Sequence, residues 1–121
     1  MTRILLIEDN PDNAELVLKI LASGGFEASH ALDAETGLEM AKKIRPGLIL
    51  LDLGLPDFDG QTLAGWLRAD PVTAKIPLVA FTAWPEATVR PMIASYGFVG
   101  YIGKPMPRTV EFLAQIKSFI K

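Results

Sequence analysis

Short, uninterrupted apolar runs alternate with longer amphipathic stretches along almost the whole chain. The runs ILLI at 4–7 and LILL at 48–51 leave no polar face, which is typical of strands that are covered on both sides. Residues 26–31, 76–81 and 98–103 are three further strand candidates. Strands that alternate with helical stretches predict an α/β fold, with one parallel sheet and helices on both of its faces.

Two of the helical stretches have a clear apolar face. Asn10 followed by Pro11 predicts the start of a helix, and Gly24 predicts its end. The last helix is expected over 109–120. The residues expected to point inward are Leu16, Val17, Ile20 and Leu21 in the first helix, and Phe112, Leu113, Ile116, Phe119 and Ile120 in the last.

Aspartates and prolines set the remaining helix boundaries. Asp33 and Asp59 are typical N-caps, and the helices they predict cover 34–44 and 60–69. Pro85 and Pro91 disfavour a long helix over 84–96. We therefore expect a loop to about residue 90 and then a short helix that opens with Pro91.

Size and composition restrict the class of protein. A chain of 121 residues, half of them apolar, corresponds to one compact domain with its own core. A net charge of -2, from 12 basic and 14 acidic side chains, predicts neither a nucleic-acid nor a lipid partner. The sequence has no cysteine, no signal-peptide pattern and no apolar run long enough to span a membrane. We expect a cytoplasmic protein with protein partners.

Polar side chains follow four of the predicted strands. Glu8 and Asp9 come after the first strand and Asp52 after the third, while Thr82 and Lys104 follow the fourth and the fifth. Because ligand sites of such sheets form at the carboxyl ends of the strands, we expect these side chains to meet there. Asp52 then ends a buried strand beside other charged groups and need not be a lone buried charge.

This set of side chains fits phosphoryl transfer. Carboxylates that lie close together repel one another unless a hard cation such as Mg²⁺ sits between them. Asp9 and Asp52 would hold the metal, with Glu8 helping through water. An aspartate can attack phosphorus to give an acyl phosphate. Lys104 would pair with the phosphoryl group and Thr82 would donate a hydrogen bond to it.

Four motifs, in order and spread over essentially the whole chain, resemble the receiver domain of two-component response regulators. They are IEDN after the first strand, LDLGLPDFDG around the third, FTA at the fourth and GYIGKP at the fifth. The resemblance implies a flavodoxin-like doubly wound fold with strand order 2-1-3-4-5. It also implies that residues 1–121 form one receiver domain without an output domain.

The resemblance further implies a role for individual residues. Asp52 is the expected phosphoacceptor, and Glu8 and Asp9 form the acidic pair that holds Mg²⁺ with Asp52. The metal also takes the carbonyl of Gly54. Lys104 and Thr82 contact the phosphoryl group, Thr82 and Tyr101 form the switch, and the bond from Lys104 to Pro105 is expected to be cis.

A receiver of this kind takes its phosphoryl group from a sensor histidine kinase or a histidine phosphotransfer protein. Phosphorylation draws Thr82 toward the phosphate and Tyr101 inward, which remodels the surface of the fourth helix, fifth strand and fifth helix. A downstream protein target docks there. The chain would catalyse its own phosphorylation and dephosphorylation but transform no outside metabolite, so we do not expect an enzyme. A homodimer through the same surface stays open.

Other functions are weighed against specific residues. A phosphatase or mutase with an aspartyl nucleophile typically needs a second aspartate two residues later, where this chain has Gly54. A receiver-like interaction module that is not phosphorylated is disfavoured because Asp9, Asp52, Thr82 and Lys104 are all present. A flavodoxin-like cofactor binder would need a phosphate loop rich in serine, threonine and glycine after the first strand, and the sequence lacks one.

Three residues depart from the family pattern. Phe98 stands where a small residue is usual, and Pro91 lies in the region of the fourth helix. Trp84, two residues after Thr82, is larger than the usual residue. We hypothesise that Trp84 shields the acyl phosphate and slows its hydrolysis.

Overall fold

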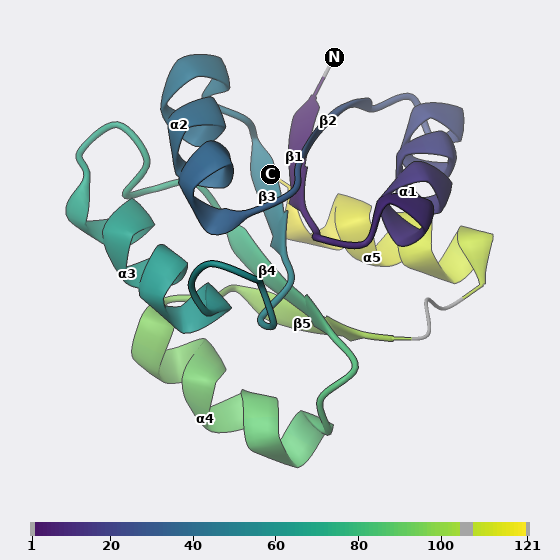
Figure 1. Ribbon diagram of the computed structural model, residues 1–121. Helices are drawn as coiled ribbons and strands as arrows, with labels where there is room; N and C mark the ends of the chain where they lie inside the picture. Colours follow the sequence, from purple (N-terminus) through teal and green to yellow (C-terminus); the bar gives the residue numbers. More distant parts are fainter. Residues whose placement is uncertain (1, 105–107, 121) are drawn as a thin grey trace.

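The computed structural model describes residues 2–104 and 108–120, over which strands and helices alternate (Figure 1). The strands are β1 (Arg3–Ile7), β2 (Glu27–Ala31), β3 (Leu48–Leu51), β4 (Leu78–Thr82) and β5 (Gly100–Gly103). The helices are α1 (Pro11–Ser23), α2 (Ala34–Ile44), α3 (Gly60–Ala69), α4 (Glu86–Tyr96) and α5 (Thr109–Phe119). All strand pairs are parallel and their order is β2-β1-β3-β4-β5, which confirms the predicted fold.

The sheet separates two apolar layers. Figure 1 shows α1 and α5 on one side of the sheet and α2, α3 and α4 on the other. Successive strand residues point to opposite faces, so Leu5 and Ile7 pack toward α2 to α4 while Ile4 and Leu6 pack toward α1 and α5. Both faces of β1, β3 and β4 are therefore buried, as the continuous apolar runs predict.

The three predicted N-caps are confirmed. The Asn10 side chain accepts hydrogen bonds from the backbone N–H groups of Asp12 and Asn13, at 3.0 and 3.1 Å. Asp33 and Asp59 each accept one from the residue three positions later, at 2.8 Å in both cases. These bonds satisfy donors that the first turn of a helix leaves unpaired, so they fix where α1, α2 and α3 begin.

The predicted inner face of α1 is partly wrong. Val17 and Leu21 are buried, but Leu16 is 53% exposed, and Ala14 takes the remaining buried position. Residues 14, 17 and 21 follow the helical repeat, whereas Leu16 lies about 100° around the axis from Val17. Leu16 is therefore an apolar side chain on the surface of α1.

The prediction for residues 84–96 is wrong. The helix α4 already begins at Glu86, and Pro91 lies inside it as its sixth residue. The fully buried Val89 anchors this helix to the core, and Met92 and Ile93 pack against the same cluster. Burial of this face outweighs the backbone hydrogen bond that proline cannot make.

Other boundaries differ by only one or two residues. The strands β2, β4 and β5 begin one to two residues later than predicted, and α5 ends one residue earlier. Close packing explains the glycine at position 37 inside α2, because a Cβ there would lie 2.6 Å from Ile7 Cδ1. None of the helices in the described ranges has the length and apolarity needed to cross a bilayer.

Candidate functional site

Glu8, Asp9 and Asp52 come together at the carboxyl edge of the sheet. One carboxylate oxygen from each lies within 4.8 Å of the others. Glu8 is 1% and Asp52 9% exposed, while Asp9 is on the surface. The backbone N–H of Asp52 donates to the carbonyl of Ile7 at 3.0 Å, and that of Glu8 to Ala31, also at 3.0 Å. These bonds continue the strand pairing by one residue and so fix the positions of both buried carboxylates.

Lys104 reaches the same cluster from the end of β5. Its ammonium nitrogen lies 2.6 Å from Glu8 Oε1 and 3.5 Å from Asp52 Oδ2. The same nitrogen is 5.1 Å from the centre of the Phe81 ring. The Lys104 backbone N–H donates to the carbonyl of Thr82 at 2.9 Å, so β4 holds the base of the side chain. The structure thus brings together all four charged residues predicted for the site.

Because Glu8 is buried beside Asp52, its ionised form is costly. Burial, followed by the contact with Asp52, raises the pKa of Glu8 from 4.5 to about 7, and Lys104 opposes this shift. Three carboxylates against one ammonium leave an excess of negative charge when all are ionised. Oxygen ligands with such an excess fit a hard divalent cation, so the donor set suits Mg²⁺.

The loop after β3 is held by hydrogen bonds to two aspartates. The backbone N–H of Gly54 donates to Asp52 Oδ1 at 3.1 Å, which orients the carboxylate. The Asp57 carboxylate accepts from the N–H groups of Ala34 and Glu35 at 2.9 and 3.1 Å, so it caps α2 together with Asp33. The partners of Asp57 in α2 lie more than twenty residues away in the chain, so the sequence alone does not reveal this cap.

The predicted switch residues Thr82 and Tyr101 meet at Trp84. The buried Thr82 hydroxyl accepts a hydrogen bond from the Trp84 N–H at 3.1 Å. The half-buried Tyr101 hydroxyl donates to the Trp84 carbonyl at 3.2 Å. Pro105 lies outside the described residues, and the predicted cis bond to it stays a prediction.

His30, the single histidine of the sequence, also contacts the site. Its Nε2 lies 2.7 Å from the carbonyl oxygen of Glu8. A carbonyl only accepts, so His30 donates this bond. It supports the backbone of Glu8 from β2, the neighbouring strand, at a residue pair that the sequence alone could not reveal.

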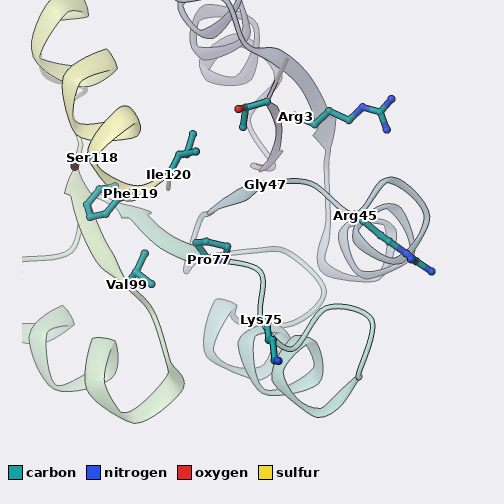
Figure 2. A pocket seen from close by; sticks show the side chains of 10 residues that line it. Arg3, Arg45, Gly47, Lys75, Pro77, Val99, Ser118, Phe119 and Ile120 are labelled. Atoms are coloured by element: carbon teal, nitrogen blue, oxygen red, sulfur yellow. The ribbon is translucent and has the colours of Figure 1, made fainter.

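A separate hollow lies at the opposite, amino-terminal end of the sheet. It has a volume of about 840 Å³ and is lined by residues that precede or begin strands and by the end of α5. Figure 2 shows Pro77, Val99 and Phe119 around it, whereas the side chains of Arg3 and Arg45 extend away from its centre. Neither arginine therefore points into the hollow, which lies at the end of the sheet opposite the carboxylate site.

Comparison with known proteins identifies the family. A family model described as the response regulator receiver domain matches residues 4–117. The polar-differentiation response regulator DivK of Brucella anthropi is 32% identical over 117 residues, which are 97% of this chain and 94% of DivK. The DNA-binding dual master transcriptional regulator RpaA of Synechocystis sp. is 35% identical over 121 residues, all of this chain but only 50% of RpaA.

Solved structures agree with this assignment. The receiver domain of sensor histidine kinase PA1611 from Pseudomonas aeruginosa PAO1, with a magnesium ion coordinated in its active-site cleft, superposes with a TM-score of 0.88 at 28% identity. The match covers 98% of this chain and 96% of that one. The chemotaxis protein CheY4 of Vibrio cholerae, at 21% identity and 99% coverage of both chains, has the same fold with a TM-score of 0.92. The chain belongs to the response regulator receiver domain family of two-component systems.

Proposed function

We propose that the chain is a phosphorylation-activated switch that accepts a phosphoryl group on Asp52. The observation that carries this proposal is the cluster of Glu8, Asp9, Asp52 and Lys104 at one edge of the sheet. Asp52 is the proposed nucleophile, because it lies within reach of Lys104 and of both other carboxylates and its Oδ1 is already oriented by the Gly54 N–H.

The proposed step forms one bond and breaks one. A carboxylate oxygen of Asp52 attacks the phosphorus of a phosphohistidine, and the electron pair of the breaking P–N bond returns to the imidazole. Lys104 exchanges its contact with Glu8 for one with a phosphoryl oxygen. The Thr82 hydroxyl accepts from Trp84, so its own proton is free to be donated to a second phosphoryl oxygen.

The acidic residues would hold Mg²⁺. Asp9 and Asp52 are the direct ligands in this proposal, with Glu8 acting through water and the Gly54 carbonyl as a further ligand. When bound, the ion supplies positive charge that offsets both the carboxylates and the transferred phosphoryl group. The magnesium ion in the related PA1611 receiver domain supports this assignment.

The proposed partners are proteins. A sensor histidine kinase or a histidine phosphotransfer protein would supply the phosphoryl group, and a downstream target would bind the surface of α4, β5 and α5, where this chain could also pair with a second copy. RpaA is described as DNA-binding, but the chain spans half of that protein. A net charge of -2 favours a protein partner over nucleic acid. We propose that the transfer of the phosphoryl group takes place in the cytoplasm, and that the chain converts no outside substrate.

Incubation with Mg²⁺ and acetyl phosphate tests the phosphoacceptor. We expect the intact mass to increase by one phosphoryl group, and the adduct to be labile to alkali. Asp52→Asn should abolish it. Asp59→Asn is the matched control, because asparagine also caps helices and this variant changes one carboxylate in the same loop. An absent adduct, or one that survives in Asp52→Asn, would favour a receiver-like interaction module that is not phosphorylated.

The same assay tests whether Trp84 shields the acyl phosphate. Trp84 is half-buried and packs against the core cluster under α2, α3 and α4. If its ring limits access of water to Asp52, Trp84→Ala should speed loss of the adduct after acetyl phosphate is removed. An unchanged rate of dephosphorylation would exclude shielding.

A further inference from the structure

The loop between β3 and α3 is closed at its base. The backbone N–H of Gly60, the first residue of α3, donates to the carbonyl of Leu53 at 3.0 Å. An ideal Cβ at Gly60 would lie 2.7 Å from Leu53 Cα and 2.9 Å from the carbonyl oxygen of Asp52. Backbone atoms cannot move aside as the end of a flexible side chain can, so glycine permits this approach. The start of α3 therefore lies directly against the end of β3.

The middle of the same loop is joined to another element by Asp57. Its Oδ1 accepts from the N–H groups of Ala34 and Phe58, both at 2.9 Å, and its Oδ2 accepts from that of Glu35 at 3.1 Å. Ala34 and Glu35 are the first two residues of α2. The N–H groups of a first helical turn have no partner within the helix and attract negative charge. One carboxylate thus connects the loop after β3 to the start of α2.

The helix α2 also has an ordinary cap of its own. Asp33 occupies the N-cap position, and its side chain accepts from the N–H of Thr36 at 2.8 Å. A local cap of this kind is the usual way to begin a helix. Asp57 is exposed, so its position is set by its hydrogen bonds and not by burial. The second carboxylate therefore restrains the loop from which it comes, in addition to capping the helix.

The restrained segment includes Gly54, three residues before Asp57. The N–H of Gly54 donates to Asp52 Oδ1 at 3.1 Å. Gly54 itself is exposed, and a Cβ there would meet no atom of the described residues within 4 Å, so side-chain packing does not fix it. The position of this peptide thus depends on the points that anchor the loop, which are its closed base and the bonds of Asp57.

We propose that Asp57 is a positioning residue for the metal site, which acts by tying the loop that carries Gly54 to the start of α2. This rests on the function proposed above, in which the Gly54 carbonyl is a ligand of Mg²⁺. Without the tie the loop would sample more conformations, and metal binding would have to order it. Coupling of this kind is reciprocal, so Mg²⁺ should in turn strengthen the bonds of Asp57 to Ala34 and Glu35.

Calorimetric titration with MgCl₂ alone measures the dissociation constant for Mg²⁺ without any phosphoryl transfer. We expect Asp57→Ala to raise this constant by about fivefold or more, as for other coupled sites. Asp57→Asn keeps one oxygen for Ala34 and Phe58 but loses the acceptor for Glu35. Its constant should therefore lie between those of the unchanged chain and Asp57→Ala. Physiological salt limits the effect of the lost charge itself.

Asp33→Ala is the matched control. It removes one carboxylate and one cap from the same helix but no bond to the loop after β3, so the dissociation constant should stay nearly unchanged. Amide exchange followed by NMR gives a second measure. Addition of Mg²⁺ should slow exchange at Ala34 and Glu35 in the unchanged chain, and this slowing should be lost in Asp57→Ala. Circular dichroism checks that all variants are folded.

Two results would overturn the role of Asp57 alone. One is an unchanged dissociation constant in Asp57→Ala, and the other is an equal loss of affinity in Asp57→Ala and Asp33→Ala, which would make Asp57 only a second cap of α2. If the unchanged chain bound no Mg²⁺, the proposed metal site would fail and the role of Asp57 with it. An absent adduct in the acetyl phosphate assay would count against the proposed function but not against the tie.

Discussion

Lys104 pairs more closely with Glu8 than with Asp52. Its ammonium nitrogen is 2.6 Å from the former and 3.5 Å from the latter. Because Glu8 is almost fully buried, its charge depends on a neighbouring cation. Any ligand that draws Lys104 away must leave Glu8 with another cation or with a proton. Protonation, metal binding and the position of Lys104 are therefore coupled at this site.

Stabilisation by Mg²⁺ should grow with pH. The pKa of Glu8 is raised by burial to about 7. The folded chain keeps this proton where the unfolded chain has lost it, so the contribution of Glu8 to stability is complete below its unfolded pKa and is lost as the pH rises through about 7. Mg²⁺ competes with that proton. The rise in melting temperature on adding Mg²⁺ should therefore be larger at about pH 8 than at about pH 5.5.

Glu8→Gln is the control for this pH dependence. It removes the titrating group and should make the effect of Mg²⁺ on the melting temperature similar at both pH values. An equal effect of Mg²⁺ at the two pH values in the unchanged chain would contradict the coupling of metal and proton at Glu8.

Lys104→Met should slow phosphorylation by acetyl phosphate by about a hundredfold, the usual cost of removing one preorganised charge from a transferring group. The variant also leaves the buried Glu8 without its cation. We expect Asp52 to remain the modified residue, with the rate followed by intact mass over time. Lys75→Met changes a surface lysine at the opposite end of the sheet and should keep the original rate. Equal rates in the two variants would remove Lys104 from the mechanism.

Asp57→Ala should lower the free energy of unfolding by about 1 kcal/mol, as expected for a lost helix cap. Burial is the largest single influence on the pKa of Asp57 and raises it, but the bonds from the N–H groups of Ala34, Glu35 and Phe58 together outweigh burial and lower the pKa. Its contribution is thus present above the unfolded pKa and is lost as the pH falls below it. Urea unfolding near neutral pH measures the change. Glu39→Ala, which removes an exposed charge from α2 without a cap, should have little effect.

Arg68→Ala should lower the free energy of unfolding by about 3 kcal/mol, since it leaves three carbonyls without their charged donor. The guanidinium donates to Ala74 and Ile76 at 2.7 and 2.9 Å and to Gly97 at 2.8 Å, so it ties the loop before β4 to the end of α4. Arg90→Ala is the matched variant. Within residues 2–104 and 108–120, the one ion pair of Arg90 is an exposed pair with Glu86 on α4, and its loss should cost less than about 1 kcal/mol in the same unfolding experiment.

Local signals were sufficient to predict the sheet, three helix caps and the cluster of charged residues. Continuous apolar runs mark buried parallel strands, and side chains that directly follow such strands must share one edge of the sheet. This rule places Lys104 at the same edge as Glu8, although 96 residues separate them, but it does not predict which carboxylate Lys104 contacts most closely. No ligand or partner was needed for that inference.

Side-chain contacts between segments that are distant in the sequence were not predictable in the same way. The bonds of Asp57 to the start of α2, of Arg68 to Gly97 and of His30 to Glu8 each join segments whose approach depends on the finished packing. The start of α4 was missed for a related reason, because the burial of Val89 decides it against the local effect of proline.

Pro91→Ala should stabilise the chain by about 1 kcal/mol. Proline at this interior position of α4 cannot donate to the carbonyl four residues earlier, and alanine restores that bond. The gain is reduced because alanine also gives the unfolded chain more freedom. Pro85→Ala should have the opposite sign, since Pro85 precedes the helix with a φ of -58° that suits proline, and the helix uses only its carbonyl. Urea unfolding of both variants decides the matter: a loss of stability in Pro91→Ala would contradict the prediction, because it would mean that the restored backbone bond contributes less than the proline ring does at this position.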